Sequence, residues 1–172
     1  MARAADSKLV MLRGNSGSGK TTVARFLQHL IGRGTLVVSQ DVVRRDMLWV
    51  RDEGGAIPLL LELIGYGQRT SPVTILEGIL RTDWYGPLFD ELRRRFGENI
   101  WAYYYDLPFE ETLRRHAMRP QRTQFGESDM RSWWRERDLV GSIPEAILTE
   151  ELSARGAARR IYRDITGGEA AE

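Results

Sequence analysis

A glycine-rich stretch, GNSGSGKTT at residues 14–22, carries residue types suited to holding phosphate groups. It matches G-x-x-x-x-G-K-[ST] at every fixed position. Its glycines allow a tight turn whose backbone N–H groups point inward, where no side chain obstructs them. Lys20 is expected to reach the β- and γ-phosphates of a nucleotide, and the Thr21 hydroxyl to bind Mg²⁺. The predicted nucleotide site consists of Gly14, Asn15, Ser16, Gly17, Ser18, Gly19, Lys20, Thr21 and Thr22.

The segments on either side of this stretch are those that a phosphate loop requires. Residues 8–13 (KLVMLR) form a short apolar run that stops at a glycine, as a buried parallel strand would. In residues 20–30, apolar side chains recur with helical spacing. The loop therefore leads from a strand into a helix, whose N-terminal dipole favours phosphate. This context favours a phosphate loop over a glycine-rich turn that binds nothing.

The rest of the chain alternates between strand and helix patterns. Strands are expected at residues 34–41, 71–78, 99–108 and 145–150. Helices are expected at residues 42–50, from residue 58 onward, and at 83–97, 108–119, 129–140 and 152–165. This alternation implies a parallel sheet covered by helices on both faces. We expect one α/β domain over residues 1–172, with a frayed tail at 167–172.

Composition restricts the location and the partners. The net charge of +1 gives no general reason to expect a nucleic-acid or membrane partner. The absence of cysteine excludes disulfides and thiolate metal sites. No apolar run approaches the length of a membrane span, and residues 1–8 lack the apolar core of a signal peptide. We therefore expect a cytoplasmic protein, whose oligomeric state the sequence leaves open.

Other phosphate-loop classes fit the chain poorly. A switch GTPase reads guanine with an N-K-x-D motif, and neither Lys8 nor Lys20 follows an asparagine. A motor would need more chain than 172 residues for its coupling elements. A compact phosphotransferase is the interpretation that remains, although the sequence does not distinguish ATP from GTP.

Asp41 follows the second predicted strand, at the sheet edge where open α/β sheets bind ligands. A carboxylate there would accept the proton of an attacking hydroxyl while the γ-phosphoryl group moves to it. The alternative is that Asp41 only caps the following helix. Arg44, one turn further, would position an acidic or phosphorylated substrate, or simply lie on a solvated helix face.

Glu77 ends the apolar strand VTILEG, where a Walker B carboxylate belongs. There it would hold a magnesium-bound water or the substrate. Direct Mg²⁺ ligation is more usual for aspartate than for glutamate. We expect Glu77 and Thr21 to form the metal site, and the alternative is a carboxylate in a surface turn.

Arginines gather in residues 113–138, around an irregular stretch between two predicted helices. Arg115 and Arg119 share a helix face at i, i+4 spacing, and Arg122 follows in the loop. This composition is typical of a lid, here residues 119–130, that closes over the phosphates and neutralises transition-state charge. Arginine suits the task because its planar fork pairs with phosphate oxygens bidentately. An arginine-rich surface is the alternative.

Four segments together resemble the small phosphate-loop kinases of the AAA_33 type, namely GNSGSGKTT, SQDVVRRDML, ILEGIL and DLPFEETLRRHAMRPQ. That group includes chloramphenicol phosphotransferase, zeta-toxin kinases, gluconate kinase and the kinase domain of polynucleotide kinase. The resemblance implies a three-layer fold whose five-stranded parallel sheet has the order 2-3-1-4-5. It also implies ATP and Mg²⁺ as cofactors and a mobile lid. Its catalytic residues would be Lys20, Asp41, Arg115 and Arg119.

The acceptor does not follow from this resemblance. Residues 48–68, the expected acceptor site, contain Trp49, Arg51 and a hydrophobic helix. This mixture favours a small or partly apolar hydroxyl compound over a long polyanion. The substrate contacts that we expect are made by Asp41, Arg44, Trp49, Glu77 and Arg122.

The leading hypothesis is an ATP- and Mg²⁺-dependent kinase that phosphorylates a hydroxyl of a small molecule, such as an antibiotic or a nucleoside-like compound. A polynucleotide 5′-hydroxyl kinase is the second, and the near-neutral charge argues against the basic groove that it needs. A regulatory NTPase module and a toxin-like kinase are further alternatives.

Overall fold

The computed structural model describes residues 7–51, 54–118 and 125–168. The strands are β1 (Lys8–Gly14), β2 (Leu36–Ser39), β3 (Val73–Gly78), β4 (Ile100–Tyr105) and β5 (Glu145–Leu148). The α-helices are α1 (Lys20–Ile31), α2 (Ile57–Thr70), α3 (Thr82–Phe96), α4 (Phe109–Ala117), α5 (Glu127–Trp133) and α6 (Ala154–Thr166). Two shorter helices are the π-helix η2 (Val42–Met47) and the 3-10 helix η3 (Gly54–Ala56).

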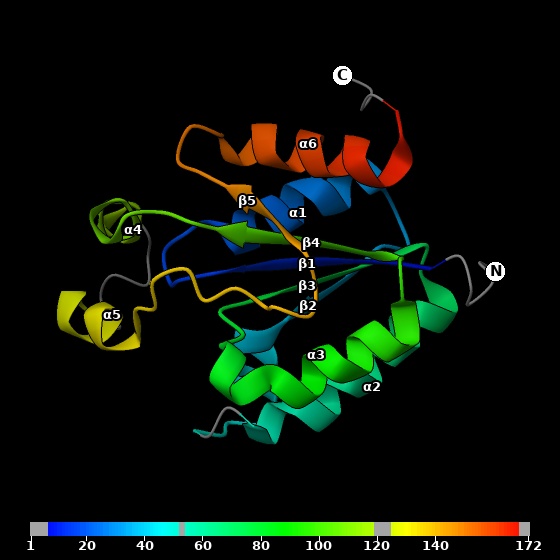
Figure 1. The fold of residues 1–172 in the computed structure, drawn as a ribbon, viewed down its shortest axis with the longest axis horizontal. Helices are drawn as coiled ribbons and strands as arrows, with labels where there is room; N and C mark the ends of the chain where they lie inside the picture. Colours follow the sequence, from blue (N-terminus) through cyan, green and yellow to red (C-terminus); the bar gives the residue numbers. More distant parts are fainter. Residues whose placement is uncertain (1–6, 52–53, 119–124, 169–172) are drawn as a thin grey trace.

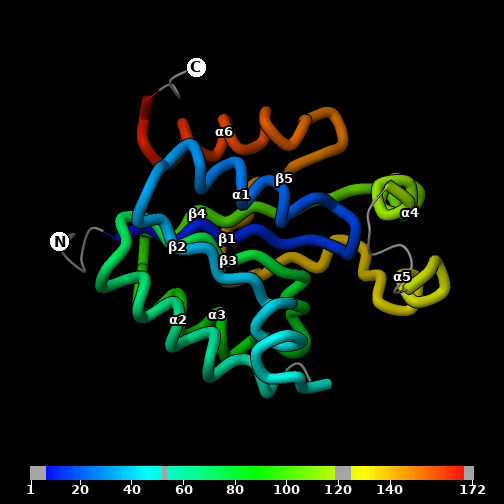
Figure 2. Tube along the Cα trace, turned by 180° about the vertical axis from the view of Figure 1, so that it is seen from behind, coloured from blue at the N-terminus to red at the C-terminus, as the bar shows by residue number. Residues whose placement is uncertain are grey.

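The strands form one parallel sheet with the order β2-β3-β1-β4-β5. This confirms the expected α/β fold and strand order. Helices α1 and α6 cover one face of the sheet, and α2 and α3 cover the other (Figures 1 and 2). Because all five strands run the same way, their carboxyl ends meet at one edge. Helices α4 and α5 lie side by side beyond that edge in both views.

Strand β1 forms the centre of the core. Its side chains alternate between two hydrophobic clusters, as the period of two in a strand requires. Leu9 and Met11 pack on the side of α2 and α3, whereas Val10 and Leu12 pack on the side of α1 and α6. All four side chains are fully buried, which explains the continuous apolar run in the sequence.

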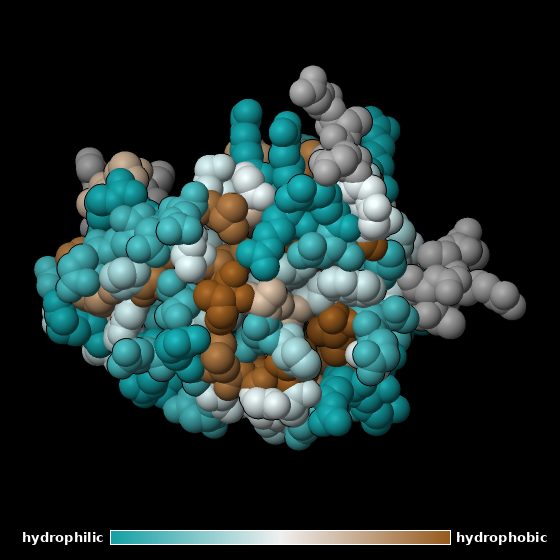
Figure 3. All heavy atoms as spheres, turned by 45° about the horizontal axis from the view of Figure 1, so that its top comes forward, coloured by the Kyte–Doolittle hydropathy of each residue, from teal (hydrophilic) through white to brown (hydrophobic). Residues whose placement is uncertain are grey.

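Helix α6 shows how the surface layer is built. Its Ser153 N-cap accepts a hydrogen bond from the Gly156 N–H at 3.0 Å. Its apolar face buries Ala158 and Ile161 in the hydrophobic cluster that it shares with α1 and the sheet, and Arg155, Arg159 and Arg163 are exposed. The side of the molecule that carries α6 is accordingly mostly hydrophilic, with a central band of apolar residues (Figure 3). Across the described ranges, none of the helices combines the length and the apolar character that a membrane span requires.

The segment after β2 differs from its prediction. In place of an α-helix over residues 42–50, the chain forms the six-residue π-helix η2 and then turns at Trp49, whose φ is 52°. The Val50 N–H donates to the Arg44 carbonyl at 3.0 Å, which closes this turn. Asp41 is itself in the right-handed helical conformation and its side chain makes no capping hydrogen bond, so the capping role is wrong. Short π-helices occur frequently at functional sites.

The helix predicted over residues 129–140 is wrong beyond Trp133. Helix α5 ends there because Trp134 adopts an extended backbone, with φ −59° and ψ 135°. The next residue is held by a distant side chain. The Asn15 amide donates to the Arg135 carbonyl at 2.7 Å and accepts from the Arg135 N–H at 3.0 Å. These bonds use the backbone groups that a continued helix would need.

Two predicted features fall partly outside the described residues. Of the lid expected at 119–130, residues 119–124 lie outside them, and with these the candidate lid arginines Arg119 and Arg122. Of the tail, Gly167 is described and ends α6 in the left-handed conformation, at φ 72°. Residues 169–172 lie outside the described part.

Candidate active site

The phosphate loop joins β1 to α1 at the carboxyl edge of the sheet, as expected. The Lys20 ammonium donates to the Asn15 carbonyl at 2.9 Å and to Ser18 Oγ at 3.2 Å. Only 7% of the Lys20 surface is exposed, so its charge is folded back against its own loop. The loop thus concentrates positive charge and backbone N–H groups at the N-terminus of α1, where phosphate binds favourably.

Two glycines of the loop are required by close contacts. At Gly14, where φ is 141°, a Cβ would lie 2.8 Å from the Cβ of Tyr105. At Gly17, where φ is 84°, a Cβ would lie 2.5 Å from the carbonyl oxygen of Thr112 in α4. Both positions combine a backbone conformation that favours glycine with space for no side chain. The loop can therefore lie directly against β4 and α4.

Arg115 reaches this loop from α4. Its Nη1 donates to the Ser18 carbonyl at 2.8 Å, and its Nε donates to Glu111 Oε1 at 2.6 Å. Hydrogen bonds from Arg114 and Arg115 lower the pKa of the Glu111 carboxyl to about 2. The Glu111 charge therefore persists at neutral pH and orients Arg115. Of the three lid arginines predicted from the sequence, Arg115 is the one within the described part of the chain, and it contacts the loop.

Thr21 and Glu77 lie together. Thr21 Oγ1 donates to Glu77 Oε1 at 3.2 Å, and 3% of the Glu77 surface is exposed. Strand pairing explains this position, because Glu77 is in register with Leu12 at the end of β1. A hydroxyl and a carboxylate are oxygen ligands of the kind that Mg²⁺ prefers, and Mg²⁺ usually takes its other ligands from water and substrate phosphates. The two residues fit a magnesium–nucleotide complex.

Asp41 lies at the same sheet edge, beyond β2. Ser39 is in register with Glu77, and the Gln40 Cβ comes so close to Gly78 that a Cβ there would lie 2.7 Å from it. The Asp41 side chain is 53% exposed. Its Oδ1 lies 3.7 Å from Arg44 Nη2 and 3.5 Å from Arg45 Nε. The predicted base is thus accessible to a ligand and paired with arginines.

A cavity of about 800 Å³ is lined in part by Arg44 and Arg45, the two arginines that pair with Asp41. It is lined by four arginines and three tryptophans, which are Arg44, Arg45, Arg51, Arg81, Trp49, Trp84 and Trp133. Its walls come from η2 and the turn after it, from the segment between β3 and α3, from the first turn of α3, and from α5. The predicted substrate residues Arg44 and Trp49 are thus brought together in one cavity, whereas Glu77 lies beside the phosphate loop.

Arg13, which was not predicted from the sequence, forms a buried hydrogen-bond network at the carboxyl end of β1. It is fully buried at the end of β1, and its Nη1 donates to both carboxylate oxygens of Glu145, at 2.9 and 3.0 Å. Its Nη2 donates to Asp138 Oδ2 at 3.0 Å and to the Leu80 carbonyl at 2.8 Å. A buried guanidinium requires such partners. In the sequence, the feature that could have indicated this network is an arginine at the end of an otherwise apolar strand.

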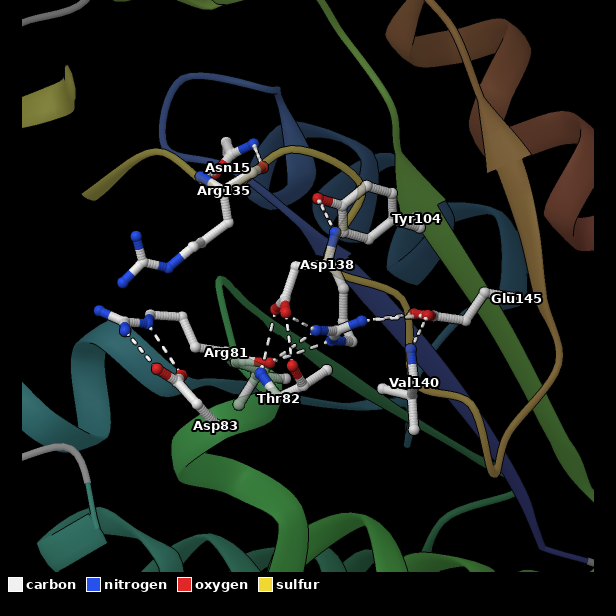
Figure 4. Close-up of polar contacts among 11 residues, drawn as sticks. Asn15, Arg81, Thr82, Asp83, Tyr104, Arg135, Asp138, Val140 and Glu145 are labelled. Carbon is white, nitrogen blue, oxygen red and sulfur yellow. Dashed lines mark hydrogen bonds and ion pairs between the residues drawn. The ribbon is translucent and has the colours of Figure 1, made fainter. Parts of the chain in front are cut away.

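Asp138 extends this network to α3 (Figure 4). Its carboxylate accepts from the Thr82 N–H at 3.0 Å and from the Thr82 hydroxyl at 2.5 Å. Its own N–H donates to the Tyr104 oxygen at 3.1 Å. The segment after α5 is therefore attached both to the central sheet and to the start of α3.

Arg135 is a second residue that the sequence analysis missed. Its backbone is held by Asn15, and its side chain extends toward Arg81 (Figure 4). Arg81 pairs with Asp83 through two hydrogen bonds, at 3.0 and 2.5 Å, and its guanidinium carbon lies 4.0 Å from the Trp84 ring centroid. The hydrogen bonds from Arg81 lower the pKa of Asp83, and the charges of Arg81 and Arg135 act in the same direction.

The segment that carries Arg135 separates two cavities. Trp133 lines the cavity of about 800 Å³. Trp134, Glu136 and Arg137 line a second cavity, of about 540 Å³, which Asn15 of the phosphate loop also lines. The phosphate loop therefore adjoins one cavity through Asn15 and the other through the segment that Asn15 holds.

Residues 9–166 match a family described as AAA domain, AAA_33, over most of the chain. The chain belongs to this AAA-domain family. The resemblance to the AAA_33 type of phosphate-loop kinase is therefore confirmed. Among curated proteins, no sequence matches this AAA-domain protein.

Solved structures share the fold of this AAA-domain protein. The tunicamycin resistance protein of Deinococcus radiodurans superposes with a TM-score of 0.68 at 20% identity, covering 96% of this chain and 99% of the other. The APS kinase of Mycobacterium tuberculosis, in complex with AMPPNP and APS, gives 0.65 at 18% identity, covering 95% and 99%. A gluconokinase of Sinorhizobium meliloti gives 0.57 at 14% identity, covering 95% and 97%. At these identities the likeness shows a phosphate-loop kinase fold.

Proposed function

We propose that the protein is a kinase that transfers the γ-phosphoryl group of ATP to a hydroxyl of a small molecule. The observation that carries this proposal is the cavity of about 800 Å³ at the same sheet edge as the phosphate loop, whose lining residues Arg44 and Arg45 both pair with Asp41. A cavity of this size suits a small molecule. A regulatory NTPase module would have no need of it.

The phosphate loop and α4 supply the positive charge for the transfer. Lys20 lies in the loop, and Arg115 donates to the loop carbonyl of Ser18. Both would contact phosphate oxygens and neutralise charge that develops on the transferred group. Mg²⁺, when bound between Thr21, Glu77 and the nucleotide, would add further positive charge there.

Asp41 would act as the general base. The acceptor oxygen attacks the γ-phosphorus, the bond from that phosphorus to the β–γ bridging oxygen breaks, and ADP leaves with that oxygen. The proton of the acceptor hydroxyl passes to an Asp41 carboxylate oxygen. The exposed fraction of 53% gives a bound hydroxyl access to this carboxylate, and Arg44 and Arg45 lie 3.7 and 3.5 Å from its Oδ1.

The solved structures of similar fold support a small-molecule acceptor. They include a gluconokinase, an APS kinase and a protein named for tunicamycin resistance. An antibiotic therefore belongs among the acceptors to test.

A transfer assay tests this proposal. The purified protein is incubated with Mg²⁺ and γ-labelled ATP against antibiotics, sugars, nucleosides, nucleotides and 5′-hydroxyl oligonucleotides. Asp41→Asn and Lys20→Ala are assayed in parallel, with Asp90→Asn on the exposed side of α3 as the matched control. We expect label on one class of small molecule, lost in both site variants and retained in Asp90→Asn. Hydrolysis without transfer, equal in wild type and Asp41→Asn, would contradict the proposal, and label on oligonucleotides would favour the polynucleotide kinase.

A further inference from the structure

We propose that the compound bound in the cavity of about 800 Å³ carries an anionic group, a carboxylate or a phosphate, next to a flat ring. The cavity arginines would bind the anionic group and the cavity tryptophans would bind the ring. This inference rests on the proposed function, because it names the class of the acceptor.

The charge of the cavity favours an anion. Its lining contains four arginines and no carboxylate among the described residues. Two carboxylates touch these arginines from outside the lining. Asp41 is shared by Arg44 and Arg45, and Asp83 pairs with Arg81. Arginine forks bind carboxylate and phosphate bidentately, so an anionic ligand would complete this charge balance.

Arg44 has unused donor capacity. Its Nε is buried and has no hydrogen-bond partner in the described part of the chain, and its side chain is 14% exposed. Its Nη1 contact with the Arg51 carbonyl is long, at 3.4 Å. Buried N–H groups are rarely left without an acceptor. A ligand oxygen that draws the Arg44 side chain toward the cavity would supply one.

Arg135 adds positive charge to the other side. Its side chain extends toward Arg81, and both arginines act on the single carboxylate of Asp83 (Figure 4). Because Asn15 holds the backbone of Arg135, this charge lies between the phosphate loop and the cavity. Two guanidinium groups near a single carboxylate favour a further anion beside them.

The tryptophans favour a ring. Trp49 is 90% exposed although it lines the cavity, and its left-handed backbone, with φ 52°, is unusual for a bulky residue. Strained residues of this kind gather at ligand sites. Trp84 is 43% exposed and already stacks on the Arg81 guanidinium. Indole faces stack readily on flat rings, and a ring held there would lie beside the arginine that binds the anion.

This class is narrower than the small or partly apolar hydroxyl compound that residues 48–68 alone suggested. The difference comes from Arg81 and Trp84, which lie outside that segment and which the fold brings to the same cavity. A ring without charge would leave the excess of arginine over carboxylate around the cavity uncompensated, and a charged sugar without a flat ring would leave Trp49 exposed.

Matched pairs of compounds test the inference. They are nucleoside 5′-monophosphates against the same nucleosides, and 4-hydroxybenzoate against 4-hydroxybenzyl alcohol, with sugar phosphates as anions that lack a flat ring. Binding is followed by tryptophan fluorescence and calorimetry with a non-hydrolysable ATP analogue at saturation, so that the nucleotide site is filled. We expect the anionic member of at least one pair to bind about tenfold or more tightly than its uncharged partner, the gain typical of a charge-assisted hydrogen bond. A difference in affinity within the nucleotide pairs indicates recognition of phosphate, and a difference within the 4-hydroxybenzoate pair indicates recognition of carboxylate.

Variants identify the side chains responsible. Arg51→Gln and Arg81→Gln should each weaken the binding of the anionic compound of a pair by about tenfold. Neither substitution should change the binding of its uncharged partner. Trp49→Ala should weaken the binding of both compounds of a pair, because both contain the ring. Arg159→Gln, at an exposed position on α6, is the matched control and should change neither.

The outcomes separate this inference from the proposed function. Equal binding within every pair, or binding of sugar phosphates alone, would overturn the inference. Transfer of label only to uncharged compounds would also overturn it and leave the kinase intact. Tight binding of an anionic ring compound without transfer would support the inference and contradict the kinase.

Discussion

The side-chain amide of Asn15 pairs with both backbone groups of Arg135, a residue 120 positions away in the chain. The phosphate loop therefore holds the chain between Trp133, which lines the larger cavity, and Glu136, which lines the smaller one. This contact lies directly after the end of α5, and the Arg135 side chain extends from it toward Arg81 (Figure 4).

The first prediction concerns this contact. Asn15→Ala should lower the free energy of unfolding by about 1–3 kcal/mol, because it leaves the Arg135 N–H and carbonyl without their partner. Arg135→Ala keeps both backbone bonds and should change stability by less than about 0.5 kcal/mol. Chemical denaturation of the two variants and the wild type measures the difference. Equal losses in both variants would show that the side chain of Arg135, and not the amide pairing, holds the segment.

The second prediction concerns the buried charges. Glu145→Gln should destabilise the protein by about 3–5 kcal/mol, because the fully buried Arg13 loses one of its two charged partners. Glu151→Gln, at an exposed position three residues beyond β5, is the control and should be nearly neutral. Urea unfolding monitored by circular dichroism gives both values. A loss below about 1 kcal/mol would mean that Asp138 alone compensates the charge.

The third prediction concerns the contact between the loop and α4. Gly17→Ala should weaken ATP binding by more than about tenfold, because the new Cβ meets the Thr112 carbonyl at 2.5 Å and φ is 84°. Gly86→Ala is the matched control, since a Cβ there meets nothing within 4 Å. It lies inside α3 and should stabilise the protein by about 0.5–1 kcal/mol. Calorimetric titration with ATP would contradict the prediction if both variants bound equally.

The fourth prediction concerns pH. Because the pKa of Glu111 is lowered from 4.5 to about 2 by hydrogen bonds from Arg114 and Arg115, its ionised form is the one that stabilises the fold. That contribution is fully present above pH 4.5 and is lost as pH falls toward 2. Unfolding of wild type and Glu111→Gln at pH 7, 5 and 3 measures it. The gap between the two proteins should stay constant from pH 7 to 5 and narrow by pH 3, and a gap that already narrows at pH 5 would contradict this assignment.

Local signals explain what the sequence predicted well. The phosphate loop needs only a short run of glycines between an apolar strand and an amphipathic helix, and all of these are visible in residues 8–30. The parallel sheet follows from the alternation of strands and helices. The strand order was predicted from the resemblance to known kinases. The pattern of strands and helices in this sequence alone does not specify that order.

Long-range contacts explain what the sequence did not predict. The bonds from Asn15 to residue 135, and from Arg13 to residues 138 and 145, join positions more than 100 residues apart. No local pattern encodes them, so α5 was predicted too long. The π-helix η2 has the composition of an ordinary α-helix. The π-helix leads directly into the turn at Trp49. No residue pattern in the sequence indicates either feature.

The two outer strands of the sheet are also its shortest. β2 and β5 have four residues each, whereas β1, β3 and β4 have six or seven. An edge strand of four residues offers few free backbone groups to a second polypeptide, which is a recognised protection against strand addition and aggregation. Copies of this protein therefore have little means of joining their sheets edge to edge, and any self-association would have to use side-chain surfaces instead.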